Sequence, residues 1–211
     1  MMPRLLPLAA AALLALVFSG CVDLGPSADP SRFYTLSPIA EAGKPRETTS
    51  GEERKALSLG IGPIKLPAYL DREGIVTRKS ENRIEISEID RWAEPLREEL
   101  SRVLSQNLAA LLCTDRILTY PWQVELEPAC RVGVEILRFE LAEDRTAHLS
   151  ARWAVWKANE KGPAAVKEST LARPADGAGA EATVAALSRL LGDLSREIAK
   201  GVEAVSGQAG T

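Results

Sequence analysis

The 211-residue sequence contains few of the side chains that most often carry out catalysis or bind metal ions. It has one histidine, His148, and three cysteines, and no two of the cysteines form a Cys-x-x-Cys pair. Because protein zinc sites need several closely spaced cysteine or histidine ligands, a metal site is not expected. A Walker phosphate loop and a Gly-x-Ser-x-Gly nucleophile turn are also missing. We therefore predict no catalytic residues, no enzymatic activity and no cofactor.

Clusters of positive charge are missing as well. The chain has 26 lysine and arginine residues against 29 aspartate and glutamate residues, which gives a net charge of −3 at pH 7. Recognition of nucleic acid needs clustered basic side chains that neutralise phosphates. A nucleic-acid partner is therefore not expected.

The longest apolar run lies at the N-terminus, where Arg4 is followed by the segment Leu5–Phe18 and then by Ser19, Gly20 and Cys21. A positive residue, a short apolar stretch and small residues in this order are typical of an export signal. The run is shorter than the roughly 20 apolar residues of a membrane-spanning helix. No cationic cluster follows it, so a transmembrane anchor is the less favoured alternative. We predict a signal peptide at residues 1–20, cleaved between Gly20 and Cys21.

The residues at the predicted cleavage site, Phe18-Ser19-Gly20-Cys21, resemble the lipobox of bacterial lipoproteins, which ends in a small residue and a cysteine. The Cys21 thiol would form a thioether to diacylglycerol, and two or three acyl chains anchor a protein stably where one holds it marginally. Cleavage before an unmodified cysteine is the alternative. In some bacteria an aspartate directly after the lipidated cysteine retains a lipoprotein in the inner membrane. Because Val22 follows here, we expect a lipid anchor in the outer membrane, facing the periplasm.

Two cysteines remain once Cys21 is lipidated, namely Cys113 and Cys130. An even pair in the oxidising periplasm is interpreted first as a disulfide. Closing a loop of about 15 residues would stabilise the fold by roughly 3 kcal/mol in the chain-entropy model. The alternative is two buried thiols that act as small apolar residues.

Beyond the signal peptide, the chain divides into a short tether at residues 21–31, rich in proline, glycine and serine, and a domain at residues 32–207. Alternating apolar residues predict strands, whereas the polar stretch 40–56 predicts a mobile surface loop. The expected strands are 32–36, 57–66, 75–78, 84–87, 117–120, the two arms of a long hairpin over 131–157 with a bulge near Leu137, and 166–171.

Two amphipathic helices complete the expected elements. The first begins between Asp90, a candidate cap, and Pro95, and it ends near Cys113. The apolar residues of the second repeat at spacings of three and four: Val184, Leu187, Leu191, Leu194 and Ile198. This stripe covers only about two heptads, so packing against a sheet is favoured over a coiled coil. Two helices and a mixed sheet predict a single α/β sandwich domain.

Trp153 and Trp156 lie three residues apart on an expected strand, so their side chains face opposite sides of the sheet. One indole can fill the core while the other is partly exposed. An exposed tryptophan would indicate a binding surface. The alternative is a sheet covered by helices on both faces.

Five segments of the domain carry a recognisable pattern: Phe33–Leu36, Gly62–Arg72, Ile75–Arg78, Asn82–Leu96 and Thr119–Trp122. Within them, Tyr-Leu-Asp-Arg is followed by Ile-Val-Thr-Arg, and Asp-Arg-Trp-Ala-Glu-Pro-Leu opens a helix. Together these segments resemble the ABC-type transport auxiliary lipoprotein family, also described as PqiC-like (paraquat-inducible protein C). The resemblance extends over roughly residues 30–205, and Glu73-Gly74 stand where the family commonly has Pro-Gln.

The resemblance implies a Rossmann-like α/β sandwich and a non-enzymatic role in intermembrane lipid transport. Family members accompany MCE-domain proteins, which form periplasmic conduits for phospholipids, together with an inner-membrane transporter. The lipoprotein would be the outer-membrane end, anchored by its lipid and docked onto the conduit. Association into a homo-oligomer is left open. The competing class is an envelope lipoprotein that activates or scaffolds another machine, such as a peptidoglycan synthase, and a third is an enzyme with an unfamiliar site.

Five charged or aromatic residues near the expected hairpin and helix start are candidates for a docking surface on the partner: Asp71, Arg72, Asp90, Arg91 and Trp92. The alternative is that they form a helix cap and a local salt-bridge network, which contributes little to binding.

Overall fold

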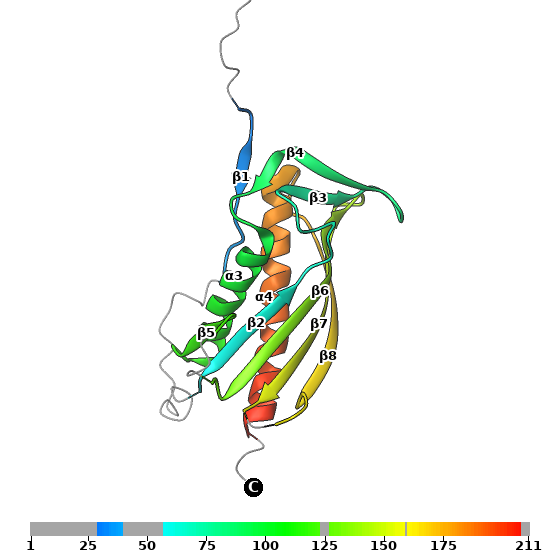
Figure 1. Ribbon diagram of the computed structural model, residues 1–211. Helices are drawn as coiled ribbons and strands as arrows, with labels where there is room; N and C mark the ends of the chain where they lie inside the picture. The colour runs from blue at the N-terminus through cyan, green and yellow to red at the C-terminus, as the bar shows by residue number, and fades with distance from the viewer. Residues whose placement is uncertain (1–28, 40–56, 123–126, 159, 208–211) are drawn as a thin grey trace, which may run out of the picture. The chain divides into compact units, whose positions relative to one another are not determined.

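The computed structural model describes residues 29–39, 57–122, 127–158 and 160–207, and these form eight strands and two helices (Figure 1). The predicted signal peptide, Cys21 and the polar stretch 40–56 lie outside the described residues. In chain order the elements are β1 Arg32–Tyr34, β2 Leu59–Lys65, β3 Gly74–Arg78, β4 Ile84–Trp92, α3 Leu96–Leu112, β5 Ile117–Thr119, β6 Cys130–Ala142, β7 Thr146–Lys157, β8 Ala165–Pro174 and α4 Gly179–Gly207. This confirms the predicted α/β class with one mixed sheet and two long helices.

Strand β6 organises the sheet. One of its edges pairs with antiparallel β7, which in turn pairs with β8. Its other edge is shared, because β2 runs parallel to its first half and β3 runs parallel to its last residues. Each of these neighbours starts a branch, β2–β5 on one side and β3–β4–β1 on the other (Figure 1). The segment between β2 and β3 therefore leads from one branch of the sheet to the other.

The long hairpin expected over residues 131–157 is present as β6 and β7. Its register shifts between Ile136 and Arg138, which confirms the bulge predicted near Leu137. After the bulge, Phe139 returns to the core side and Glu140 stands on the other face, opposite His148 in β7. The extra residue thus changes which side chains the last third of β6 presents on each face.

The start of the first helix differs from the prediction. Asp90 was a candidate cap, but it lies in β4, where it pairs with Arg32 of β1 in parallel register. The cap position is Pro95, and α3 begins at Leu96. Strand β4 continues past the expected end at Ser87 because the short N-terminal strand β1 supplies hydrogen-bond partners along its last three residues.

The core lies between the sheet and the two helices. The stripe of α4 is buried against β6, β7 and β8, which confirms packing on the sheet. Trp153 is 1% exposed and donates from Nε1 to Ser169 Oγ at 2.9 Å. Its ring lies so close to Gly201 of α4 that a Cβ there would be 2.6 Å from Cη2. Glycine at residue 201 is therefore needed for the helix to approach this indole.

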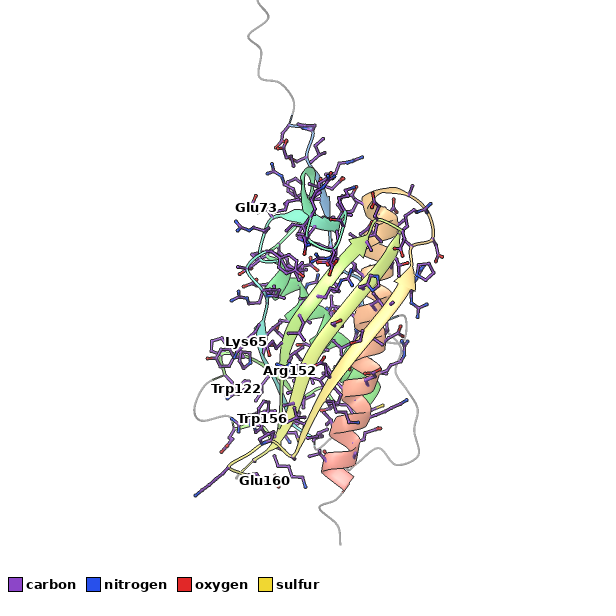
Figure 2. All side chains as sticks on the ribbon, turned by 90° about the vertical axis from the view of Figure 1, so that its right-hand side faces the viewer. Lys65, Glu73, Trp122, Arg152, Trp156 and Glu160 are labelled. Carbon is purple, nitrogen blue, oxygen red and sulfur yellow. The ribbon has the colours of Figure 1, made fainter. Side chains whose placement is uncertain are left out.

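The opposite face of the sheet, which we call the outer face, carries Trp156. Figure 2 shows β6, β7 and β8 in front of the helices, with Arg152 and Trp156 on the near side. Trp156 is partly exposed and covers Gly133, where a Cβ would lie 3.1 Å from its ring. Arg152 bridges Glu135 and Glu168 at 3.3 Å each. The two tryptophans thus face opposite sides, as predicted, and the described helices cover one face only.

Hydrogen bonds from polar side chains hold the segment after β1, residues 35–39, against the helices. Asn107 of α3 accepts from the Ile39 amide at 2.9 Å and donates to Ser195 of α4 at 2.9 Å. Glu99 of α3 is buried and accepts from the Leu36 amide at 3.0 Å. Burial raises the pKa of the Glu99 carboxyl above its usual range. These contacts fix the N-terminal end of the domain to the helix layer.

Candidate functional site

Four of the five predicted docking residues surround one hollow of about 360 Å³, which we call the docking hollow. It is formed by the end of β1, the loop before β3, the end of β4 and the start of α3. The residues that line it are Phe33, Asp71, Arg72, Glu73, Arg91, Trp92, Ala93, Glu94, Pro95 and Leu96. Asp90 does not line it, because its carboxylate pairs with Arg32 at 2.8 Å and accepts from the Tyr34 hydroxyl at 3.2 Å.

Local ion pairs use several of the charges around the docking hollow. Asp71 pairs with Arg97 of α3 at 2.6 Å, and Arg91 pairs with Glu73 at 3.6 Å. Exposed pairs of this kind contribute at most about 1 kcal/mol each. Arg72 is exposed and its guanidinium has no ion pair among the described residues. The alternative of a local salt-bridge network therefore applies to Asp71 and Arg91 and leaves Arg72 available to a partner.

Aromatic residues contribute to the docking hollow in two ways. Trp92 is 6% exposed, so its ring is part of the wall and is not a projecting anchor. Phe33 is 62% exposed and projects from β1 beside Arg91, its partner in the ladder. Sequence reasoning did not include Phe33 in the docking surface. The signal was an aromatic residue on a very short strand at the edge of the sheet.

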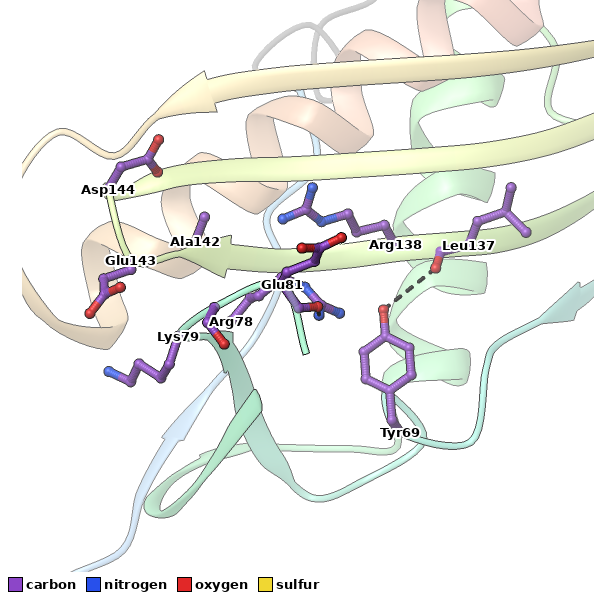
Figure 3. Close-up of a pocket in the computed structure, with 10 residues that line it drawn as sticks. Tyr69, Arg78, Lys79, Glu81, Leu137, Arg138, Ala142, Glu143 and Asp144 are labelled. Atoms are coloured by element: carbon purple, nitrogen blue, oxygen red, sulfur yellow. Dashed lines mark hydrogen bonds between the residues drawn. The ribbon is translucent and has the colours of Figure 1, made fainter. Parts of the chain in front are cut away.

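A second, larger pocket of about 810 Å³ lies on the outer face, where the two branches of the sheet part (Figure 3). We call it the junction pocket. Its lining combines three basic and three acidic residues with smaller or apolar ones: Arg78, Lys79 and Arg138; Glu81, Glu143 and Asp144; Tyr69, Ser80, Leu137 and Ala142. Tyr69 and Arg78 come from the two segments Tyr-Leu-Asp-Arg and Ile-Val-Thr-Arg, and the fold brings these segments together here.

A buried carboxylate, Glu140, links the basic residues of the junction pocket. Its side chain is 0% exposed, and its Oε1 accepts from Nε of Arg78 and from Nε of Arg138, the latter at 3.0 Å. Its Oε2 is buried without a hydrogen-bond partner among the described residues. The hydrogen bond to Glu140 raises the pKa of Arg78. One carboxylate thus holds two guanidinium groups side by side.

The pKa values of two further side chains, Tyr69 and His148, are shifted near this cluster. Burial, with the negative charge of Glu140 as the second cause, raises the pKa of Tyr69 to about 12. Burial lowers the pKa of His148, which stands opposite Glu140, and the nearby Arg138 charge acts in the same direction. At neutral pH the junction pocket therefore has a neutral phenol beside charged arginines.

The two cysteines of the domain are free thiols in the structure, which differs from the predicted disulfide. Cys113 closes α3 in a left-handed conformation, and its Sγ lies 3.7 Å from the Ala110 carbonyl oxygen. Cys130 is buried at the start of β6, and its Sγ lies 3.6 Å from Ser206 Oγ of α4. The two sulfurs thus have different neighbours on different elements, so proximity in sequence does not bring them together.

Neither a metal site nor a membrane span is found in the part of the chain that the structure describes. No three histidine, cysteine or acidic side chains gather there as a metal-binding group. Neither α3 nor α4 combines the length and the apolarity that a bilayer-crossing helix requires.

Comparison with solved structures shows to which class of fold the domain belongs. A crystal structure of an uncharacterised protein has a TM-score of 0.66 at 18% identity, covering 82% of this chain and 98% of that one. Protein XCC0632 from Xanthomonas campestris has a TM-score of 0.69 at 13% identity, covering 84% and 98%. At these identities the likeness establishes the shared α/β fold. No curated protein matches the chain.

The family follows from the sequence match. The model of the family described as "ABC-type transport auxiliary lipoprotein component" matches residues 34–199. The chain belongs to this family, which confirms the resemblance found in its sequence segments. It is thus an auxiliary lipoprotein that acts with transport proteins and is anchored at a membrane of the cell envelope.

Proposed function

We propose that this protein is the outer-membrane lipoprotein subunit of an MCE-type intermembrane phospholipid transport system. In this role it docks the periplasmic conduit at the outer membrane and carries out no catalysis itself. The observation that carries the proposal is the family match over residues 34–199. The docking hollow supports it, because one concave surface joins an exposed phenylalanine and an arginine for which the described part of the chain supplies no ion pair.

Lipidation at Cys21 would limit how far the domain can lie from the membrane surface. Ser31, where the compact unit of the domain begins, lies ten positions after Cys21 in the sequence. A fully extended chain of this length spans at most about 36 Å. The domain would therefore remain near the bilayer, and a partner on it would have a high effective concentration at the membrane. This matters for lipid transfer because each acyl methylene exposed to water costs about 0.8 kcal/mol.

The docking hollow would receive a projecting part of the conduit protein. An apolar side chain of the partner can pack on Phe33, which now exposes most of its surface to water. A carboxylate of the partner can pair with Arg72, and a guanidinium binds a carboxylate through two parallel hydrogen bonds. An aromatic anchor next to an arginine is the composition typical of interface hot spots.

The test is co-purification of the MCE protein with charge-reversed variants. Arg72→Glu is expected to lower the recovery of the MCE protein at least tenfold, because an interfacial charge contact is lost and a repulsive one replaces it. Lys161→Glu is the matched control: it also reverses an exposed positive charge, next to Glu160, which Figure 2 places far from Glu73 at the other end of the domain. Lys161→Glu should leave recovery unchanged.

The identity of the recovered protein decides between the alternatives. Recovery of an MCE protein that depends on Arg72 supports the proposal. Recovery of a peptidoglycan synthase in its place would favour the activator role. Equal recovery of the MCE protein with Arg72→Glu, in a folded variant, would remove the docking hollow from the proposal.

A further inference from the structure

The junction pocket has a positive end with unused hydrogen-bond donors. Each of its two arginines uses Nε on Glu140, and Arg78 also donates from Nη1 to the Glu81 carbonyl oxygen at 2.9 Å. A guanidinium has five N–H donors. The Nη groups of Arg138 make no hydrogen bond within the described residues. Two positive charges share one buried negative charge here, so the cluster retains an excess of one positive charge.

The other end of the junction pocket is acidic. Glu143 and Asp144 lie in the turn between β6 and β7, and both are exposed. Asp144 uses Oδ1 to accept from the Thr146 amide at 2.9 Å, and its carboxylate remains exposed to solvent. Figure 3 shows the two acids at the turn and Arg138 farther along β6, toward Tyr69 and Leu137. Arg138 and the two acids of the turn thus lie at separate ends of one pocket. Glu81 also lines it beside the arginines, and the ammonium of Lys79 pairs with Glu85 at 3.3 Å.

We propose that the junction pocket binds a phosphoethanolamine headgroup, with its phosphate on Arg138 and Arg78 and its ammonium between Glu143 and Asp144. Planar guanidinium groups match phosphate oxygens in pairs. With the buried Glu140 included, the site has three basic and four acidic groups, so a plain anion gains little net attraction, whereas a ligand with both charges can pair with groups of both signs. A volume of about 810 Å³ lies within the usual range for ligand pockets. The inference rests on the proposed function, because phospholipid transport would supply this ligand.

Titration of the full mature chain in a non-lipid detergent tests the site. With sn-glycero-3-phosphoethanolamine as the probe, isothermal titration calorimetry should show saturable one-to-one binding. Arg138→Gln should weaken it at least tenfold, which corresponds to about 1.4 kcal/mol. Arg152→Gln is the matched control, because Arg152 is also an outer-face arginine paired with glutamates but does not line the pocket. It should bind as the wild type does.

The acidic end is tested independently of the buried cluster. The double variant Glu143→Gln with Asp144→Asn keeps the side-chain oxygens that the turn needs but removes both charges. It should weaken binding of the phosphoethanolamine probe, whereas binding of inorganic phosphate should not weaken, because two repelling charges are removed. If both probes bind equally to wild type and double variant, the ligand is phosphate alone and the proposal fails. If the headgroup probe does not bind at all, it fails as well.

Two further experiments distinguish a lipid ligand from a soluble one, and headgroup binding from docking of the conduit protein. Phosphatidylethanolamine added to the micelles should displace the soluble probe; failure to do so would show that the pocket takes a soluble phosphate ester and would overturn the lipid assignment. Arg138→Lys, which keeps the charge but loses the planar donor pair, covers the case in which Arg138→Gln does not fold, and should also bind more weakly than wild type. Arg138 variants should still recover the MCE protein. Wild-type protein that recovers the MCE protein but does not bind the headgroup probe would overturn this inference alone and leave the proposed function standing.

Discussion

The close contact between Gly201 and Trp153 gives a stability prediction whose size follows from the structure. In Gly201→Ala, the added Cβ would lie 2.6 Å from Cη2 and 2.7 Å from Cζ3 of an indole that is almost fully buried. Overpacking a core in this way costs about 1–3 kcal/mol, while the better helix propensity of alanine returns about 1 kcal/mol. We expect a net loss of about 1 kcal/mol in the free energy of unfolding. For a domain of this size that lowers Tm by about 2–4 °C.

A double-mutant cycle separates the clash from the propensity effect. Trp153→Phe removes the outer ring atoms that the new Cβ would meet. In that background Gly201→Ala should stabilise the protein by up to about 1 kcal/mol, because only the gain in helix propensity remains. The assay is urea unfolding followed by circular dichroism. An alanine effect of the same sign and size in both backgrounds would refute the packing argument.

The remaining predictions concern single groups. The Tyr69 phenol should ionise with a pKa of about 12, measured as the change in absorbance at 295 nm that Tyr69→Phe removes; a pKa near 10 would show that the phenol is not buried beside Glu140. Because burial lowers the pKa of His148, the unfolded chain takes up the proton more readily than the folded one, so stability should fall as pH drops below about 6.5. His148→Gln should flatten this dependence, and an unchanged slope would contradict the assignment. Asn107→Ala leaves the Ile39 amide without its acceptor and should cost about 1–3 kcal/mol in urea unfolding, whereas a cost near zero would mean that water replaces the amide.

The elements that local pattern determines were predictable from the sequence. The alternation along residues 131–157 requires two strands whose inner faces are apolar, and the break in it near Leu137 requires a bulge. The stripe on α4 requires a single buried face. In each case the burial of the side chains follows from positions a few residues apart.

Features that depend on distant partners were not predictable in this way. The local sequence around Asp90 is typical of a helix cap. In the fold Asp90 instead pairs with Arg32 of β1, which lies 58 positions earlier in the chain. Glu140 looked like an ordinary polar residue in a strand, because nothing near it in sequence shows that Arg78 will arrive from another strand. The docking residues were partly predictable, since their segments flank the helix start, but Phe33 came from a remote edge strand.

The most direct test of the proposed role is a photocrosslink from the docking hollow in living cells. A photoreactive amino acid replacing Phe33, on the full chain with its lipid anchor intact, should capture the MCE conduit protein as the main product, identified by mass spectrometry. The same group at Lys161 should not capture it. If residue 33 captured a cell-wall synthase, or if both positions captured the MCE protein equally, docking of the conduit through this surface would be contradicted.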